Sequence, residues 1–178
     1  MKTSLYHERI LELADNAEYV RIIERPDREA SGTNALCGDR VSIQLEMDRD
    51  EIRRLYYQVR GCLLCRASCA ELARIATGLD RTRLKVLRDA LERFLRSPGN
   101  GSTIPPGLHV FEPVRAHRSR HRCVLLPYDA ALQALSDPDI KKLWDPKVGD
   151  RMVKLVLIGR HMNQEKLTKE LDECLAAE

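Results

Sequence analysis

Residues 41–59 limit the possible folds of this 178-residue chain more than any other stretch, because they predict two antiparallel strands. Apolar and polar residues alternate from Val41 to Met47, which is the pattern of a strand with one buried face. Residues 48–50 predict a turn, and residues 52–59 predict a second strand. So short a connection joins two strands only in opposite directions. We therefore expect an antiparallel sheet.

The segments around this strand pair predict helices that pack on the sheet. Apolar residues at helical spacing predict helices over residues 4–17, 67–77, 80–96 and 123–135. In the first helix the residues expected on the buried side are Leu5, Ile10, Leu11 and Leu13. Ser4 and Asp80 are the expected N-caps, and residues 19–31 predict a loop or an edge strand. The expected fold class is α+β, a small, mostly antiparallel three-stranded sheet packed against helices.

The composition excludes several classes of protein. The 30 basic and 27 acidic residues leave a net charge of +3, so overall charge favours neither nucleic acid nor a membrane surface as partner. No apolar run approaches the roughly 20 residues that span a bilayer, and the first residues lack the apolar stretch of a secretory signal. We therefore expect a cytoplasmic protein. In that compartment, six cysteines indicate metal binding or sulfur chemistry rather than disulfides.

Three separated segments carry cysteines that can act together. Cys37 and Asp39 flank a glycine, and in an extended segment their side chains would point to the same side, within reach of one metal ion. Cys62 is expected just ahead of a helix, where the free N–H groups favour a thiolate. With Cys123, three thiols and one carboxylate match the ligand count of a tetrahedral zinc site. Cys37 and Asp39 alone would also fit a buried thiol beside a turn aspartate.

The other cysteines have simpler interpretations. Cys62 and Cys65 form a Cys-x-x-Cys pair, which fits half of a zinc knuckle or a redox pair. Cys69 lies one helical turn after Cys65, so core packing explains both as well as chemistry does. Cys174 has the spacing of an apolar helix face and is expected in a core. We predict that neither Cys65 nor Cys69 binds the ion.

A basic run over residues 115–122 precedes Cys123 and leaves three interpretations open. It can bind phosphate groups, it can lower the pKa of Cys123, or it can be a solvated loop. The run contains no aromatic residue on which a nucleic-acid base could stack, so we do not expect nucleic acid as partner. Among the histidines, His121 is near enough to a motif to be considered as a ligand.

Three motifs in order resemble the IscU/SufU/NifU N-terminal family of iron–sulfur cluster assembly proteins. They are residues 34–39 (Asn-Ala-Leu-Cys-Gly-Asp) followed by a strand, the pair Gly61-Cys62, and the pair Arg122-Cys123. Residues 5–11 are also similar to the first helix of that family, so the resemblance covers about residues 4–135. It implies that Cys37, Asp39, Cys62 and Cys123 converge on one metal or cluster site. It further implies that Cys37 accepts sulfur, with a cysteine desulfurase and downstream iron–sulfur assembly or acceptor proteins as partners.

Two features favour the SufU-like branch of this family. Scaffolds of the IscU type carry a histidine directly before the last cysteine, whereas this chain has Arg122. The interval from Cys62 to Cys123 is 61 residues, similar to the longer interval of SufU proteins (123 − 62 = 61). The resemblance thus implies a zinc-dependent sulfurtransferase. The alternatives are an IscU-like scaffold for a [2Fe–2S] cluster on the same ligands and, from another class, a basic nucleic-acid module with a structural zinc.

The last part of the chain predicts a separate extension. We expect an IscU/SufU-like domain over residues 1–136 and an extension over residues 137–178, with a strand at 153–158 and a helix at 163–175. Parts of residues 144–175 weakly resemble the end of the C-terminal domain of CobW-type metallochaperone GTPases. No phosphate-binding loop accompanies this resemblance, so we expect a docking or packing element without nucleotide chemistry.

Overall fold

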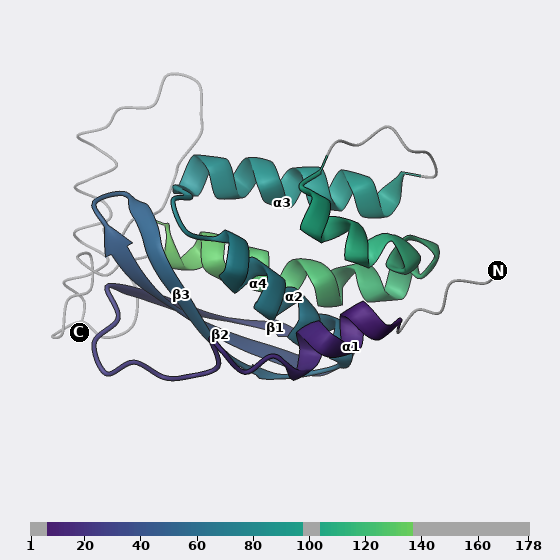
Figure 1. The fold of residues 1–178 in the computed structure, drawn as a ribbon, viewed down its shortest axis with the longest axis horizontal. Helices are drawn as coiled ribbons and strands as arrows, with labels where there is room; N and C mark the ends of the chain where they lie inside the picture. Colours follow the sequence, from purple (N-terminus) through teal and green to yellow (C-terminus); the bar gives the residue numbers. More distant parts are fainter. Residues whose placement is uncertain (1–6, 98–103, 137–178) are drawn as a thin grey trace, which may run out of the picture. The chain divides into compact units, whose positions relative to one another are not determined.

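The computed structural model describes residues 7–97 and 104–136, and its centre is a three-stranded antiparallel sheet in the order β1-β2-β3 (Figure 1). The strands are β1 (Arg28–Asn34), β2 (Asp39–Asp48) and β3 (Glu51–Arg60). The helices are α1 (Glu8–Asp15), α2 (Leu63–Ile75), α3 (Arg81–Arg96) and α4 (His121–Ala134), with 3-10 segments η1 (Pro106–Ala116) and η2 (Arg118–Arg120). The predicted α+β class is confirmed. None of the described helices is long and apolar enough to cross a membrane.

The predicted strand pair is confirmed as β2 and β3. The two strands pair antiparallel with Ile43 opposite Tyr57 and Leu45 opposite Leu55, and a two-residue turn connects them. Arg49 in that turn has a φ of 54°, the left-handed conformation that so tight a connection needs. Because alternate residues of a strand face one side, the apolar residues of both strands face the same core.

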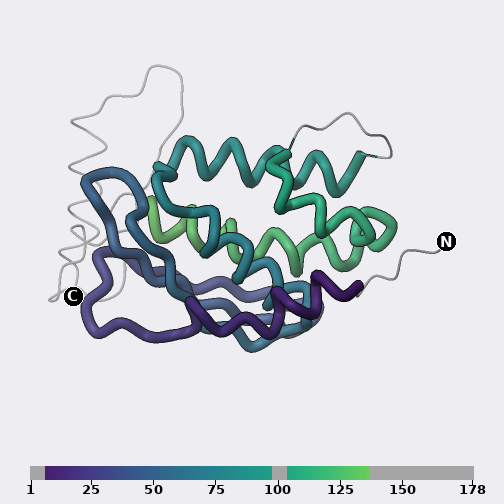
Figure 2. Tube along the Cα trace, in the orientation of Figure 1, coloured from purple at the N-terminus to yellow at the C-terminus, as the bar shows by residue number. Residues whose placement is uncertain are grey.

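Helices α2 and α4 cover one face of the sheet, as expected, and Figures 1 and 2 show α3 on the same side, while α1 packs beside α2. Helix α4 approaches β1 very closely. A Cβ atom added at Gly32 would lie 3.0 Å from Cδ1 of Leu126 and 3.4 Å from Cβ of Ala130. A larger residue than glycine would therefore push α4 away from β1. This close packing carries the first turn of α4 to the end of β1.

Helix α1 differs from its prediction at its start and in its buried side. It begins at Glu8 with His7 as N-cap, whereas the predicted cap Ser4 lies outside the described residues. The prediction that Leu11 is buried was wrong, since Leu11 is 40% exposed. The core contacts come from Ile10, Leu13 and Ala14. Leu11 lies about 100° around the helix from Ile10, because a helix turns by that angle at each residue.

Residues 19–34 contain both of the structures that were expected there. Residues 28–34 form the edge strand β1, and the residues before them form a strap across the outer face of the sheet. Val20 makes a parallel bridge to Tyr57, and the N–H of Ile23 donates to Oε1 of Gln44 at 2.9 Å. The N–H of Asp27 then donates to the carbonyl of Leu45 at 3.0 Å. The strap therefore runs from the β3 side of the sheet to the β1 side.

The other predicted helices are confirmed, with shifts of a few residues at their ends. Asp80 caps α3 by accepting a hydrogen bond from the N–H of Arg83 at 2.7 Å. Helix α4 begins two residues earlier than predicted. The predicted strand at 153–158 and helix at 163–175 lie outside the described residues. The division of the chain at residue 136 stays a prediction.

Candidate metal centre

Cys37 lies in the tight turn between β1 and β2, so the prediction of an extended segment was wrong. Strand β1 ends at Asn34 and β2 begins at Asp39, and these two residues are paired directly across the hairpin. The N–H groups of Cys37 and Gly38 both donate to the carbonyl of Asn34, at 3.3 and 2.8 Å. Gly38 has a φ of +76°, which favours glycine. Turn closure, and not strand alternation, places the Cys37 thiol near the Asp39 carboxylate.

The Asp39 carboxylate connects this hairpin to the start of α2. Its Oδ1 accepts a hydrogen bond from the N–H of Cys62 at 2.9 Å, and its Oδ2 lies 3.5 Å from the Sγ of Cys62. Gly61 is required for this contact, because a Cβ there would lie 2.8 Å from Oδ1 of Asp39. Cys62 is the N-cap residue of α2, which confirms its predicted place just ahead of a helix.

Cys123 is supplied by the first turn of α4 and is fully buried. Its Sγ lies 3.6 Å from the Sγ of Cys37 and interacts with the thiol of Cys62. Asn34 contacts Cys123 as well, with its side-chain nitrogen 3.8 Å from the sulfur. The other amide atom of Asn34, Oδ1, accepts the N–H of Leu36 at 3.2 Å. The buried Asn34 therefore links the turn to α4, a role that its place in the motif did not reveal.

The potential ligand atoms form a compact group. One atom from each of Cys37, Asp39 and Cys123 lies within 4.8 Å of the others, and this is the metal-ligand cluster found among residues 7–97 and 104–136. Cys62 is not one of these three residues, but its Sγ lies 3.5 Å from Oδ2 of Asp39, and its thiol interacts with the Cys123 thiol. An ion about 2.3 Å from tetrahedral sulfur ligands would hold them about 3.7 Å apart. The Cys37–Cys123 distance of 3.6 Å between two sulfurs fits that geometry, and the Cys62 sulfur lies 3.5 Å from an Asp39 oxygen.

The four groups change one another's proton affinity. Interaction with the Cys123 thiol, and then with the backbone N–H of Cys65, lowers the pKa of Cys62 to about 7. The Cys62 sulfur and burial raise the pKa of Cys123. Burial by itself would raise the pKa of Asp39, but the Cys37 thiol, the N–H of Cys62 and the other thiols lower it by more. Among the three thiols, Cys62 is therefore the one whose surroundings most favour ionisation.

Cys37 differs from the other two thiols in being exposed. Partial desolvation and then the Asp39 carboxylate raise its pKa, so a nearby positive charge would be needed to hold it as a thiolate at neutral pH. Cys62 is half-buried and Cys123 is buried. Of the three thiols, Cys37 is therefore the most accessible from outside the protein.

Cys65 and Cys69 lie along α2 and are completely buried in the core. Interaction with Cys69 and burial raise the pKa of Cys65, which keeps it protonated and unreactive. Their contacts agree with core packing, and the prediction that they do not bind the ion stays a prediction. Cys174 lies outside the described residues.

The basic run divides between separate structural roles. Arg115 donates to the carbonyl of Ser97, and its guanidinium lies 5.1 Å from the ring centre of Phe94. His121 is buried, with Nε2 3.3 Å from the carbonyl of Arg115. The interpretation that the run lowers the pKa of Cys123 gains no support, because the Cys62 thiol, burial and Asp39 raise this pKa. Arg115 therefore holds η1 against α3, and His121 connects α4 to η1.

Sequence comparison assigns the chain to a family. Residues 5–105 match the family described as "NifU-like N terminal domain". The chain is also similar to a solved structure, that of the N-terminal part of a nitrogen-fixing NifU-like protein from Brucella abortus. That structure is 32% identical, with a TM-score of 0.64, and the match covers 74% of this chain and 92% of that one. The chain belongs to the NifU-like N-terminal domain family.

Two further similarities accompany this NifU-like assignment. A Fervidobacterium islandicum AW-1 protein, named as an iron–sulfur cluster assembly scaffold for the SUF system, is 22% identical with a TM-score of 0.67. The match covers 74% of the NifU-like chain and 97% of that protein, and it shows a shared fold. Residues 113–175 match the family described as "Cobalamin synthesis protein cobW C-terminal domain". This second match begins within η1, ahead of the predicted boundary at residue 136.

Proposed function

We propose that this protein acts in iron–sulfur cluster assembly as a zinc-dependent sulfur acceptor, with Cys37 taking persulfide sulfur from a cysteine desulfurase. The observation that carries the proposal is the cluster of the exposed Cys37 thiol, the buried Cys123 thiol and the Asp39 carboxylate, with the Cys62 thiol against Asp39. Cys37, Asp39, Cys62 and Cys123 would hold the zinc. The desulfurase and downstream iron–sulfur acceptor proteins would be its partners in the cytoplasm.

The donor set suits a site that must hold an ion and still open. Three thiolates bind zinc or iron tightly, whereas a carboxylate is a harder ligand that these ions exchange more readily. A bound zinc would keep the thiols deprotonated at neutral pH. Asp39 receives donors on both carboxylate oxygens, from the N–H and the thiol of Cys62. It therefore has partners within the protein when it is not bound to an ion.

Sulfur transfer at Cys37 requires no oxidant or reductant beyond the persulfide itself. The Cys37 thiolate attacks the outer sulfur of the desulfurase persulfide, and a new S–S bond forms at Cys37. The S–S bond of the donor breaks, and the desulfurase cysteine leaves as a thiolate. Exposure of Cys37 in the β1–β2 turn permits this approach, while burial protects Cys123 from it.

A [2Fe–2S] scaffold is the second candidate, and membership of the NifU-like family supports it. A cluster could be assembled on the same cysteines and aspartate. Two sequence features favour zinc and sulfur transfer. Arg122 occupies the position of the IscU histidine ligand, and the interval before Cys123 is long. Metal analysis of protein purified without oxygen separates the candidates, because a stable [2Fe–2S] cluster without zinc would reverse our choice.

Variants of the ligands test the sulfur-acceptor role. We expect wild-type protein with one bound zinc to accelerate sulfide production by the desulfurase, and Cys37→Ala to abolish that acceleration. Asp39→Ala should behave differently, because it removes an exchangeable ligand but leaves the sulfur acceptor in place. Zinc content and persulfide on the peptide containing Cys37, measured by mass spectrometry, accompany the rates. Full acceleration by Cys37→Ala would contradict the proposal.

A further inference from the structure

The outer face of the sheet, opposite the helices, is covered at one end and open at the other. Its covered end lies under the strap of residues 19–27, where the guanidinium of Arg21 lies 4.7 Å from the ring centre of Tyr56. Tyr56 is buried for this reason, although its position in β3 faces outward. The open end carries Arg40 of β2 and Arg60 of β3, and both are exposed.

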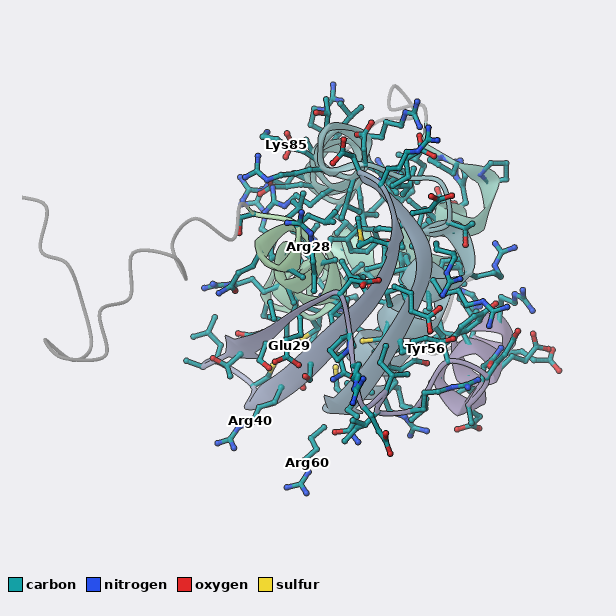
Figure 3. The ribbon with its side chains drawn as sticks, turned by 90° about the vertical axis from the view of Figure 1, so that its left-hand side faces the viewer. Arg28, Glu29, Arg40, Tyr56, Arg60 and Lys85 are labelled. Atoms are coloured by element: carbon teal, nitrogen blue, oxygen red, sulfur yellow. The ribbon has the colours of Figure 1, made fainter. Side chains whose placement is uncertain are left out.

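Arg40 and Arg60 are directly opposite each other in the antiparallel pair of β2 and β3. Residues opposite each other share a face, and like charges in that position repel. Figure 3 shows both side chains extending from the same end of the sheet. Within the part of the chain that the structure describes, neither side chain has a hydrogen bond, ion pair or ring contact. The fold therefore concentrates two unneutralised guanidinium groups at one point.

Several other charged side chains of these strands have partners. Arg53 pairs with Glu46 at 3.0 Å, and Arg54 contacts the Tyr56 hydroxyl at 3.5 Å. The side chain of Glu29 accepts from Gln44 at 3.3 Å. Arg40 and Arg60 differ from these residues, because they face each other without a partner among the described residues at the end of the sheet that carries the thiol site.

The arginine pair lies at the same end of the sheet as the candidate metal centre. Arg40 directly follows Asp39, and Arg60 is two residues ahead of Cys62. The β1–β2 turn at this end presents Cys37 together with Leu36, a large apolar side chain that is 76% exposed. An exposed leucine next to charged groups is the composition of a protein contact surface, with an apolar centre and a polar rim.

We propose that Leu36, Arg40 and Arg60 form the surface on which the sulfur-donating protein docks, and that the partner contributes carboxylate groups to it. This inference rests on the proposed function, because it names the surface by which that donor reaches Cys37. Arginine binds a carboxylate through two parallel hydrogen bonds, and two arginines side by side can hold two carboxylates. Binding of an acidic surface would also remove the repulsion between Arg40 and Arg60.

Charge reversal tests the surface. Binding of the full-length protein to the cysteine desulfurase of the same organism is measured without L-cysteine, so that no persulfide forms. We expect Arg40→Glu with Arg60→Glu to raise Kd at least about tenfold, mostly through a slower association rate. Raising the salt concentration should weaken wild-type binding more than binding of this double variant.

Arg81→Glu is a control for a changed charge, with half the charge change of the double variant. Arg81 is an exposed first residue of α3, close in the chain to Gly78, whose N–H donates to the carbonyl of Ile52. Ile52 lies at the start of β3, and Arg60 lies at the opposite end of that strand. We expect this control to bind as wild type does. Equal Kd values for the double variant and wild type, or equal weakening by the control, would overturn the proposal.

Failure of the docking surface and failure of the proposed function give different results. If wild-type protein binds the desulfurase through Arg40 and Arg60 but does not accelerate it, docking holds and sulfur acceptance fails. If Cys37→Ala abolishes acceleration while the arginine double variant binds normally, sulfur acceptance holds and the docking proposal fails. A double variant that loses affinity only for a DNA oligonucleotide would also overturn it, in favour of a phosphate-bearing partner. Zinc content of each variant shows that the site itself is intact.

Discussion

At the scale of single residues, the position of the Asp39 carboxylate depends on the absence of a side chain at Gly61. A Cβ atom there would lie 2.8 Å from Oδ1, 3.0 Å from Cγ and 3.2 Å from Cβ of Asp39. Rotation of the carboxylate could relieve the first contact but not the third, since the Cβ atom of Asp39 is fixed to the β2 backbone. The carboxylate and the start of α2 would have to separate.

Gly61→Ala should therefore weaken metal binding. We expect the dissociation constant for zinc to rise at least about tenfold, and the free energy of unfolding to fall by about 1–3 kcal/mol. Competition with a chelator and denaturant unfolding measure the two effects. Gly78→Ala is the control, because Gly78 has a φ of +80° and nothing within 4 Å of the added Cβ. The free energy of unfolding of Gly78→Ala should fall by about 1 kcal/mol through backbone strain, and its affinity for zinc should stay unchanged. A normal zinc affinity for Gly61→Ala would show that Asp39 is not a ligand.

At the scale of one element, α2 separates two kinds of cysteine. Cys62 is the N-cap residue of the helix and contacts Asp39, whereas Cys65 and Cys69 are packed inside the core. The same helix buries Glu71, which is 1% exposed and pairs with Arg74 at 2.7 Å. Nothing in the apolar spacing of the segment distinguishes these roles. They follow from which side of α2 meets α4 and the sheet.

Replacing both Cys65 and Cys69 with alanine should leave the metal content unchanged. The packing lost from the core should lower the free energy of unfolding by about 1 kcal/mol for each residue. Metal analysis and denaturant unfolding of the double variant check the two parts separately. Loss of one equivalent of metal, with the protein still folded, would mean that one of these buried thiols is a ligand.

At the scale of the whole molecule, the described residues hold a continuous core that α1, α2, α3, α4 and the sheet build together. Among these residues, the Tyr128 hydroxyl is the buried side-chain polar atom without a hydrogen-bond partner. All four proposed ligands belong to the same core-bearing part of the chain. The stability of this part and the geometry of the candidate site therefore have a common structural basis.

A chain ending at Ser136 should accordingly fold and bind one metal ion. We expect its thermal midpoint to stay within about 5 °C of the full-length value, which corresponds to a change of about 1 kcal/mol for a domain of this size. Calorimetry and metal analysis test this expectation. If the shortened chain failed to fold, the domain boundary would lie beyond residue 136. The second family match would permit this, because it begins at residue 113 and continues past residue 136 to residue 175.

The sequence by itself determined the features that depend on near neighbours. The alternation of apolar and polar residues and the short connection predicted β2, β3 and their antiparallel pairing, because strand periodicity and a two-residue turn are local properties. It also placed Cys62 ahead of α2. The motifs carried enough information to indicate the family and all four proposed ligands.

Tertiary structure decided what depends on contacts between distant residues. Cys123 reaches Cys37 across 86 residues because α4 packs closely on Gly32 of β1, which no local pattern can specify. The hairpin register sets Arg40 against Arg60 and leaves their charges unpaired at the site end. The turn at residues 35–38 replaced the expected extended segment, because pairing of Asn34 with Asp39 requires the chain to reverse between them.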